Sequence, residues 1–230
     1  MERLILDQII THIKNRTPVA LVTWLTSGRQ KIICSGDNLD HDKLRHVVNN
    51  GFLTDRSITV RMDEEEVFVN IFNPKLRMII IGAVHITQEL VPLALQACYD
   101  VKIIEPRTSF ASRERFSKLN CDVRWPDEAL SHIDLDERTA FIALTHDTKI
   151  DDLALKIALK SNVFYIGALG SKRSHSKRLE RLTTSGFSEQ DLARINGPIG
   201  LDIGAIGPVE IAISILAEVT AVLRGKLRID

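Results

Sequence analysis

The fold of this chain is decided by one stretch, Met78-Ile79-Ile80-Ile81-Gly82-Ala83-Val84-His85, in which four apolar residues lead into a glycine. A short run that is apolar at every position is typical of a strand buried on both faces of a parallel sheet. The glycine allows the tight turn from such a strand into a helix, which the apolar spacing predicts from about His85 to Cys98. We therefore predict a strand–turn–helix unit with a ligand site at the turn.

Strands and helices alternate along the rest of the chain. Further strands are expected at residues 101–104, 122–125, 139–144 and 163–166, and helices at a short segment from Pro126 and at 150–161, 171–184 and 208–223. Such alternation is typical of a parallel sheet whose strands are joined by right-handed crossovers. The predicted fold class is therefore α/β, with a Rossmann-like parallel sheet flanked by helices.

The residues before this region follow a different pattern. Helical apolar spacing covers residues 3–14, and strand-like runs cover 18–24, 31–35, 57–61 and 67–72. The short turns between these runs indicate hairpins, and Asn73-Pro74-Lys75 then breaks the pattern. The sequence thus predicts two domains, a small N-terminal α+β domain at residues 1–74 and a Rossmann-like C-terminal domain at residues 75–230.

The composition argues against several classes of protein. Thirty basic and thirty acidic residues give a formal net charge of zero, so neither a nucleic acid nor a membrane surface is an expected partner. No apolar run reaches the ~18 residues that a membrane span needs, and the N-terminus lacks a signal-peptide pattern. The three cysteines have no Cys-x-x-Cys spacing, which makes a disulfide framework or a zinc knuckle unexpected. We expect a cytoplasmic protein with reduced thiols.

Two cysteines can be placed within the predicted elements. Cys98 ends a helix just before a strand and is expected to be buried. Cys34-Ser35-Gly36 is expected at a loop, where Cys34 serves either in packing or as a reactive thiol.

The last expected helix, at residues 208–223, is apolar around most of its circumference. A helix of this kind must be covered on most sides. Two arrangements would cover it. Either the helix is clamped between the two domains, or it forms the interface of a homodimer.

Gly82 also begins an incomplete copy of the Gly-x-Gly-x-x-Gly fingerprint of dinucleotide-binding domains. In the fingerprint, the second glycine has no side chain and so lets the backbone approach a pyrophosphate. Here Val84 stands at that position, and Thr87 stands at the position of the third glycine. The helix N-terminus still favours an anion, and Glu105 ends the next strand, where such folds hold a ribose. NAD(P) binding is therefore weakened but stays open, as does a domain with an empty turn.

Topology brings together the residues that follow each strand, because the carboxyl ends of parallel strands meet at one edge of the sheet. The candidate cofactor-binding residues at this edge are Gly82, Ala83, Val84, His85, Glu105, Arg107, Thr145, His146, Asp147, Gly167, Gly170, Ser171, Lys172 and Arg173. We assign no catalytic residue among them. We also assign no metal site. Such a site needs three or four convergent ligands, His85, His146 and Asp147 are the only candidates, and each histidine is better explained as a hydrogen-bonding group.

A second glycine turn, from Gly167 to Gly170, leads into a helix for which Ser171 is the predicted N-cap. The basic residues that follow within two turns are Lys172, Arg173, His175, Lys177 and Arg178. Positive charge at a helix N-terminus opposes the macrodipole, so the arrangement is easier to explain if an anion binds there. A solvated basic face is the alternative.

Several of these segments, taken in order, resemble one family. They are Gly82-Ala83-Val84-His85-Ile86, Glu105-Pro106-Arg107, Trp125-Pro126-Asp127-Glu128-Ala129-Leu130, Leu144-Thr145-His146-Asp147, the stretch from Tyr165 to Arg173, Gly200-Leu201-Asp202-Ile203-Gly204-Ala205, and the stretch from Glu210 to Val219. The pattern is similar to the XdhC/CoxF-type maturation factors of xanthine and carbon monoxide dehydrogenases. The chain departs from longer members at Val84, where they have glycine. Their Ser-Gly-Gly-Cys segment has no clear counterpart here, so no role is assigned to Cys34.

The resemblance implies an accessory protein, more a non-catalytic chaperone than an enzyme. Such factors bind the molybdenum cofactor (molybdopterin) transiently, assist its sulfuration and insert it into the molybdenum subunit of an apo-xanthine dehydrogenase. A cysteine desulfurase is a further implied partner. From the two glycine turns together with the family resemblance, we hypothesise that Gly82–His85 and Ser171–Arg173 hold the anionic end of the cofactor. The alternatives are an NAD(P)-dependent oxidoreductase and an interaction module without a ligand.

Overall fold

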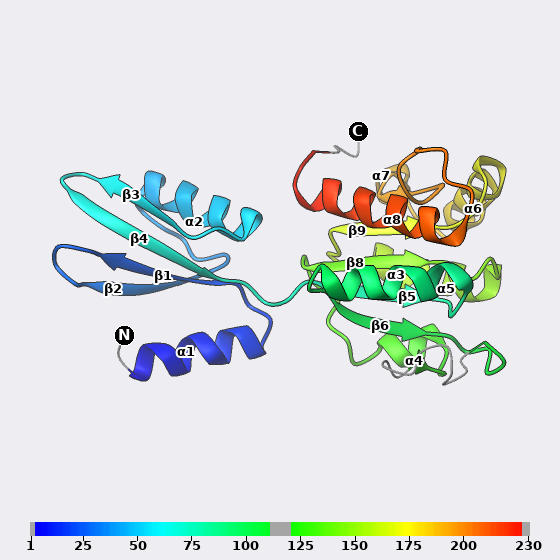
Figure 1. The fold of residues 1–230 in the computed structure, drawn as a ribbon, viewed down its shortest axis with the longest axis horizontal. Helices are drawn as coiled ribbons and strands as arrows, with labels where there is room; N and C mark the ends of the chain where they lie inside the picture. The colour runs from blue at the N-terminus through cyan, green and yellow to red at the C-terminus, as the bar shows by residue number, and fades with distance from the viewer. Residues whose placement is uncertain (1–2, 111–120, 227–230) are drawn as a thin grey trace. The chain divides into compact units, whose positions relative to one another are not determined.

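The computed structural model describes residues 3–110 and 121–226, and the chain divides into two compact units, Met1–Pro74 and Lys75–Asp230. The larger unit is built on a parallel sheet with the strand order β10-β9-β8-β5-β6-β7 (Figure 1). Its strands are β5 (Arg77–Ile81), β6 (Asp100–Ile104), β7 (Cys121–Asp122), β8 (Thr139–Ala143), β9 (Tyr165–Ala168) and β10 (Ile195–Asn196). The predicted Rossmann-like sheet is confirmed.

The strand order places a ligand crevice at a definite point. Numbered within the unit from β5, the order from β7 to β10 reads 3-2-1-4-5-6, which is the doubly wound order. The chain runs from β5 outward through β6 to β7 and then crosses back to β8 on the other side of β5, so the switch point lies between β5 and β8. In folds of this type the ligand binds there, outside the carboxyl ends of the strands.

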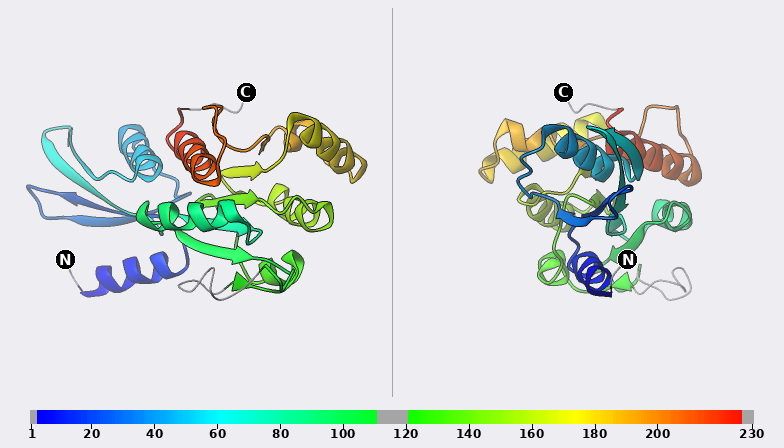
Figure 2. Two further views of the ribbon diagram at one scale, coloured as in Figure 1. Left: turned by 45° about the vertical axis from the view of Figure 1, so that its right-hand side comes forward. Right: turned by 90° about the vertical axis from the view of Figure 1, so that its left-hand side faces the viewer.

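Two layers of helices cover the sheet. The helices are α3 (His85–Gln96), α4 (Pro126–Leu130), α5 (Thr148–Leu159), α6 (Lys172–Thr184), α7 (Glu189–Leu192) and α8 (Pro208–Leu223). Helices α3 and α8 lie side by side on one face, while α4 and α5 lie on the other (Figures 1 and 2). Met78 and Ile80 of β5 pack with the first layer, and Ile79 and Ile81 pack with the second. All four are fully buried, and each contributes roughly 1.5–3 kcal/mol of hydrophobic stabilisation.

Helix α8 uses one apolar side within its own unit. Ala212, Ile215 and Val219 are fully buried in the cluster that α8 shares with α3 and the sheet. Val209 and Ile213 are 51% and 48% exposed. The contacts with α3 and the sheet therefore bury only part of the apolar surface of α8. Whether the second domain or a second copy of the chain covers the remaining surface stays a prediction.

The smaller unit is an antiparallel sheet with the order β2-β1-β4-β3. Its elements are α1 (Arg3–Lys14), β1 (Val19–Trp24), β2 (Gln30–Cys34), α2 (Asp42–Thr54), β3 (Ile58–Met62) and β4 (Glu65–Phe72). Alternate residues of β1 face opposite sides of the sheet: Ala20 and Val22 pack in the cluster with α2, and Val19 and Leu21 pack with α1. The two helices thus cover opposite faces of this sheet (Figure 1).

Two local expectations are wrong. The strand predicted at 122–125 ends at Asp122, because this carboxylate accepts hydrogen bonds from Arg124 and the chain then turns to begin α4 at Pro126. Cys98 is exposed rather than buried. It follows the C-cap of α3 with φ of +64°, a left-handed conformation that stops the helix before the next strand. Within the described residues, no helix is long and apolar enough to cross a membrane.

Candidate functional site

The turn after β5 is tight because Gly82 has φ of +113° and lies against the loop after β8. A Cβ atom on Gly82 would lie 2.9 Å from the Thr145 Cγ2 atom and 3.2 Å from the Thr145 backbone nitrogen. The Gly82 amide donates to the carbonyl of Ile104, and its own carbonyl accepts from the buried Thr87 hydroxyl at 2.6 Å. Thr87 therefore has a structural role at the position of the third fingerprint glycine. The turn directly joins the ends of β5, β6 and β8.

Glu105, at the end of β6, is fully buried and bound by donors of the protein itself. Its Oε1 atom accepts from the Arg107 Nε atom at 2.8 Å and from the Arg107 amide at 3.0 Å. Its Oε2 atom accepts from the Arg107 Nη2 atom at 2.7 Å and from the Ala83 amide at 3.0 Å. Burial alone would raise the pKa of Glu105, but these hydrogen bonds outweigh it and hold the pKa below its ordinary value.

This arrangement changes the interpretation of the fingerprint. The carboxylate at the ribose position has no exposed surface, and both of its oxygens are engaged by Arg107 and Ala83. Val84, the N-cap of α3, provides no side-chain acceptor for the first-turn amides. The turn therefore keeps a helix N-terminus that can attract an anion, but the ribose acceptor of a dinucleotide site is occupied.

A second hydrogen-bond network lies after β8. The Thr145 hydroxyl donates to the Asp151 Oδ1 atom at 2.6 Å and accepts from the Asp147 amide at 3.0 Å. Asp147 caps α5 by accepting from the Lys149 amide. Burial raises the pKa of Asp151, which is only 2% exposed, although the hydrogen bonds from Thr145 oppose this shift. Thr145 thus links the Gly82 turn to a buried carboxylate.

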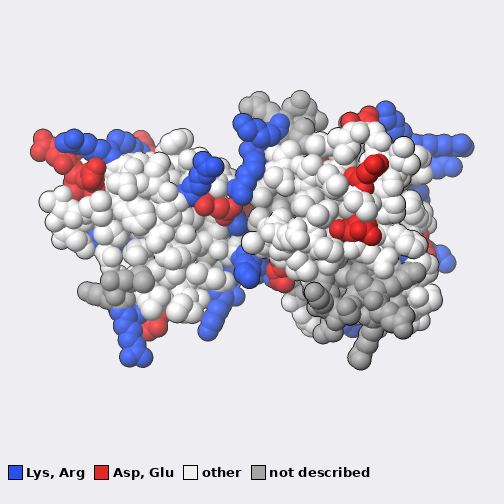
Figure 3. All heavy atoms as spheres, in the orientation of Figure 1, with Lys and Arg blue, Asp and Glu red and all other residues white. Residues whose placement is uncertain are grey.

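A cavity of about 180 Å³ opens beside this network, between the loop after β8 and the first turns of α6. It is lined by His146, Thr148, Asp151, Asp152, Leu169, Ser174, Lys177, Arg178 and Arg181. Arg181 is paired with Asp152 through hydrogen bonds of 2.6 and 3.0 Å. On the face shown in Figure 3, basic side chains gather at the end of the unit where α6 lies in Figure 1.

Arg178 is the most unusual group in the cavity wall. It is only 5% exposed, and its Nη2 atom donates to the Leu169 carbonyl at 2.7 Å. Its Nε and Nη1 atoms are buried without a hydrogen-bond partner among the described residues. Burial lowers the pKa of Arg178, while the charges of Asp151 and Asp152 oppose this shift.

The sequence-predicted residues separate into distinct groups. Gly82, Ala83, Glu105 and Thr145 form the buried frame of the edge, and Arg107, 27% exposed, covers Glu105 and lies over the Phe110 ring. The hydrogen bonds to Glu105 raise the pKa of Arg107, and the charges of Asp147 and Asp151, after β8, add to this shift. His85 and His146 are exposed, and only His146 lines the cavity.

The predicted residues around α6 have different roles. Ser171 is the N-cap of α6, as predicted, and accepts from the Ser174 amide. Lys172 and Arg173 are exposed in the first turn and do not line the cavity. Gly170 has φ of +143° at the turn. Gly167 is buried inside β9, where a Cβ atom would lie 2.5 Å from the Ile199 Cδ1 atom, so it permits close packing.

Sequence reasoning does not identify the inner wall of the cavity. Lys177 and Arg178 belong to the predicted basic run, but Ser174, Asp151 and Arg181 are absent from the sequence-based candidates. The available signal is spacing: Ser174, Lys177, Arg178 and Arg181 stand at i, i+3, i+4 and i+7 and therefore share one face of α6.

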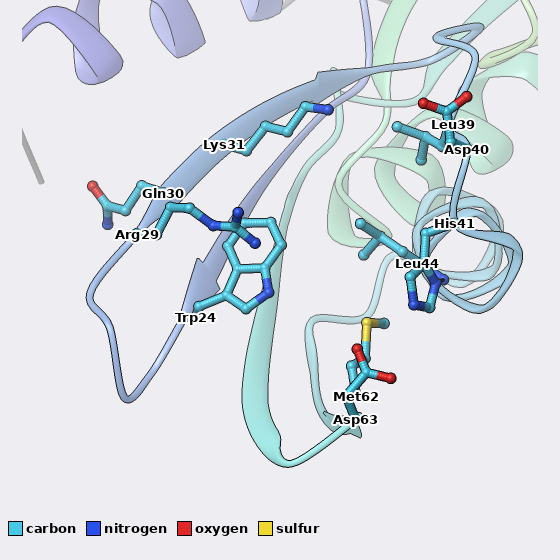
Figure 4. A pocket seen from close by; sticks show the side chains of 10 residues that line it. All are labelled: Trp24, Arg29, Gln30, Lys31, Leu39, Asp40, His41, Leu44, Met62 and Asp63. Atoms are coloured by element: carbon cyan, nitrogen blue, oxygen red, sulfur yellow. Dashed lines mark hydrogen bonds between the residues drawn. The ribbon is translucent and has the colours of Figure 1, made fainter.

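The N-terminal unit holds a larger cavity, of about 420 Å³ (Figure 4). The Arg29 guanidinium lies 3.7 Å from the centre of the Trp24 ring, and Lys31 follows on the same hairpin. Figure 4 shows Asp40 and Asp63 on the other side of the cavity. Two cations therefore face two carboxylates, so an anion gains less from this cavity than from the Rossmann unit.

Two further kinds of site, a reactive thiol at Cys34 and a cluster of metal ligands, are not supported by the described residues. Cys34 ends β2, and its Sγ atom lies 3.5 Å from the His12 Nε2 atom. Burial, and then the charge of Asp37, raise its pKa, which favours packing over a reactive thiolate. Among residues 3–110 and 121–226, no three His, Cys, Asp or Glu side chains gather as a metal site would require.

Known proteins share this architecture. The chain is similar to the solved structure of a xanthine dehydrogenase from Bacillus halodurans, with a TM-score of 0.68 and 23% sequence identity. The match covers 98% of this chain and 66% of that one. At this identity the likeness concerns the fold.

Sequence relatives match about two thirds of the chain. The molybdenum cofactor insertion chaperone PaoD of Escherichia coli (strain K12) is 32% identical over 151 residues, which are 66% of this chain and 41% of PaoD. A Bacillus subtilis (strain 168) protein, named as a probable xanthine dehydrogenase subunit, is 29% identical over 153 residues, or 66% and 44% of the two chains. The chain spans less than half the length of these curated relatives. The sequence model described as the XdhC Rossmann domain matches residues 78–219, and the chain therefore belongs to the XdhC family.

Proposed function

We propose that this protein is a maturation factor for a molybdenum hydroxylase such as xanthine dehydrogenase. It binds the molybdenum cofactor as cargo, assists its sulfuration and delivers it to the apoenzyme, without a catalytic residue of its own. The candidate site is the carboxyl edge of the sheet between β5 and β8. The cargo is held there transiently by the turn Gly82–His85, by Arg107, by the loop Thr145–Asp147 and by the turn from Gly170 to Arg173. The buried Glu105 and Gly167 support this edge from within.

One observation carries this proposal: both carboxylate oxygens of Glu105 already accept hydrogen bonds from Arg107 and Ala83. The crevice keeps two helix N-termini, at α3 and α6, which favour an anionic ligand. The acid that would hold a ribose is instead buried under Arg107. An anion without a nucleotide ribose suits this edge better than NAD(P), and the phosphate-bearing pterin of the molybdenum cofactor meets that description. The relative named as a molybdenum cofactor insertion chaperone supports the same choice.

The decisive experiment is purification of the chain from a host that makes molybdopterin. After denaturation and oxidation, we expect the fluorescence of an oxidised pterin derivative to co-elute with the protein. The matched control is the same host lacking molybdopterin synthesis. Absence of pterin fluorescence from the wild-type preparation would argue against cargo binding.

Calorimetric titration with nicotinamide cofactors distinguishes the proposed maturation factor from an NAD(P)-dependent oxidoreductase. We expect no micromolar binding of NAD(H) or NADP(H), because Val84 crowds the pyrophosphate position and Glu105 is occupied. Micromolar binding accompanied by substrate turnover would reverse the assignment.

The double variant Lys172→Ala/Arg173→Ala tests the exposed first turn of α6. Both side chains reach solvent, so each acts through a screened charge worth about 0.3–1 kcal/mol. We expect the affinity for the cofactor to fall about tenfold at low salt and less at high salt. An unchanged affinity at low salt would remove these residues from the site.

The proposed partners follow from this role. The client is the molybdenum subunit of an apo-xanthine dehydrogenase, and a cysteine desulfurase supplies the sulfur. We also propose a homodimer, supported by the exposed apolar residues Val209 and Ile213 of α8 and Ile206 just before it. Sedimentation of the purified chain decides between monomer and dimer.

A further inference from the structure

The cavity beside α6 contains a charge that the fold does not satisfy. Buried arginine side chains are ordinarily paired, because an ionised group away from water without partners is strongly destabilising. Arg178 has one bond, to the Leu169 carbonyl, and two buried nitrogen atoms without partners among the described residues. Both charged neighbours of opposite sign, Asp151 and Asp152, are already engaged by Thr145 and Arg181. The guanidinium is therefore free to bind an incoming acceptor.

The size of the cavity limits what that acceptor is. Pockets that enclose a whole drug-sized ligand measure about 300–1,000 Å³, whereas this one measures about 180 Å³. It can hold a terminal group of a ligand whose remainder lies outside. Ser174 and Lys177 add further donors to the same wall, and the N-terminus of the 13-residue α6 adds its dipole. The end group is therefore a compact anion.

The carboxylate in the wall narrows the chemistry. Asp151 lines the same cavity as the Arg178 guanidinium but forms no hydrogen bond with it among the described residues. A fully ionised sulfate-like group would meet only repulsion from Asp151. A phosphate monoester, whose second pKa is near 6, still carries a hydrogen in part of its population at neutral pH. It can donate that hydrogen to Asp151 and accept from Arg178.

We propose that the cavity is a binding site for the phosphate of a monoester, with Arg178 as its principal ligand-binding residue. The fork of Arg178 contacts two oxygens of the phosphate monoanion and balances its charge. Asp151 accepts the phosphate hydroxyl, and Lys177 balances the charge of Asp151. The identity of that monoester as the phosphate of molybdopterin rests on the proposed function. In that case the phosphate lies one turn deeper along α6 than Lys172 and Arg173, and the pterin extends toward Gly82.

Binding of methyl phosphate tests the site without any cofactor. The wild-type chain, in a buffer free of phosphate, is titrated with methyl phosphate by calorimetry and by phosphorus NMR. Sodium chloride of equal ionic strength is the blank. We expect binding in the millimolar range and a loss of at least tenfold in the variant Arg178→Met, because each charge-assisted hydrogen bond is worth roughly that factor. The variant Arg178→Lys keeps the charge but not the fork, and it should give an intermediate affinity.

Arg194→Met is the control for the removal of an arginine whose guanidinium donates to backbone carbonyls. Arg194 donates to the carbonyls of Leu159 and Ser161, away from the cavity, so its loss should leave methyl phosphate affinity unchanged. Thermal unfolding shows whether Arg178→Met folds. If it does not, the comparison uses Arg178→Lys. Equal affinity in wild type and in the folded Arg178 variant, or no wild-type binding, overturns the site.

Failure of the phosphate site and failure of the proposed function give different experimental results. Methyl phosphate binding that depends on Arg178, without pterin in any preparation, supports the phosphate site and contradicts the cargo. Pterin that copurifies equally with wild type and Arg178→Met supports the cargo and overturns the site.

Discussion

Replacing Arg107 with methionine is expected to destabilise the Rossmann unit by about 3–5 kcal/mol at pH 7, because it leaves a buried carboxylate without its partner. Glu105 has no exposed surface and would keep only two backbone donors, the amides of Ala83 and of residue 107, with no positive charge beside it. The free energy of unfolding from chemical denaturation measures the effect. This is the largest stability change that we expect from a single substitution at the site.

The pH dependence of this variant should run opposite to that of the wild type. In the wild type the pKa of Glu105 lies below its ordinary value of 4.5, so the pair stabilises the fold above that pH and loses this contribution as the pH falls. Without Arg107, burial dominates and raises the pKa of Glu105. The folded variant then binds more protons than the unfolded chain, so its deficit shrinks as the pH is lowered from 7 toward 5.

Arg124→Met is a matched control. Arg124 forms the same bidentate contact with a carboxylate two residues earlier, at 3.0 and 2.7 Å to Asp122. Arg124 is 48% exposed, and Lys102 remains 3.7 Å from Asp122, so its removal should cost at most about 1 kcal/mol. Equal losses in the Arg107 and Arg124 variants would show that burial of Glu105 is not the cause.

The substitution Gly82→Ala should cost about 3 kcal/mol of unfolding free energy. A residue with a side chain at φ of +113° carries roughly 1–3 kcal/mol of backbone strain. The new methyl group also meets the Thr145 side chain at 2.9 Å and the carbonyl carbon of Leu144 at 3.3 Å, and such overpacking costs about 1–3 kcal/mol. Because Thr145 must shift, its hydrogen bond to Asp151 should weaken as well.

Gly186→Ala separates the two contributions. Gly186 follows α6 with φ of +93°, and a Cβ atom there would meet nothing within 4 Å. This variant carries backbone strain alone and should lose about 1–2 kcal/mol. If Gly82→Ala is no more destabilising than Gly186→Ala, the contact with the Thr145 loop does not constrain the turn.

The fold was largely predictable because its strongest signal is local. The apolar run of β5 and the regular alternation after it leave few topologies for a parallel sheet. Helix α2 was not predicted, since its buried positions, Leu44, Val48 and Gly51, form a thin stripe interrupted by glycine. Strand β10 has only two residues, which is too short for a periodic pattern.

The site was predictable in position but not in its inner contacts. Parallel topology places the strand ends together whatever their chemistry, so the edge could be located from the sequence. Whether Glu105 faces a ligand or its own neighbour depends on how Arg107 folds back over two residues, and spacing does not report that. The burial of Arg178 depends on the packing of α6 against α5, a long-range property that a basic run in the sequence conceals.

The small volume of the α6 cavity has a practical and a cellular consequence. A pocket that accepts only the terminal phosphate admits free inorganic phosphate equally well, so phosphate buffers would compete with cargo and weaken its apparent affinity by the factor 1 + [phosphate]/Kd. Living cells contain the same competitor at all times. Discrimination between the proposed cargo and the free ion would then arise outside the pocket, at the strand ends. The two halves of the site would thus divide their work, one retaining any phosphate and the other selecting the molecule attached to it.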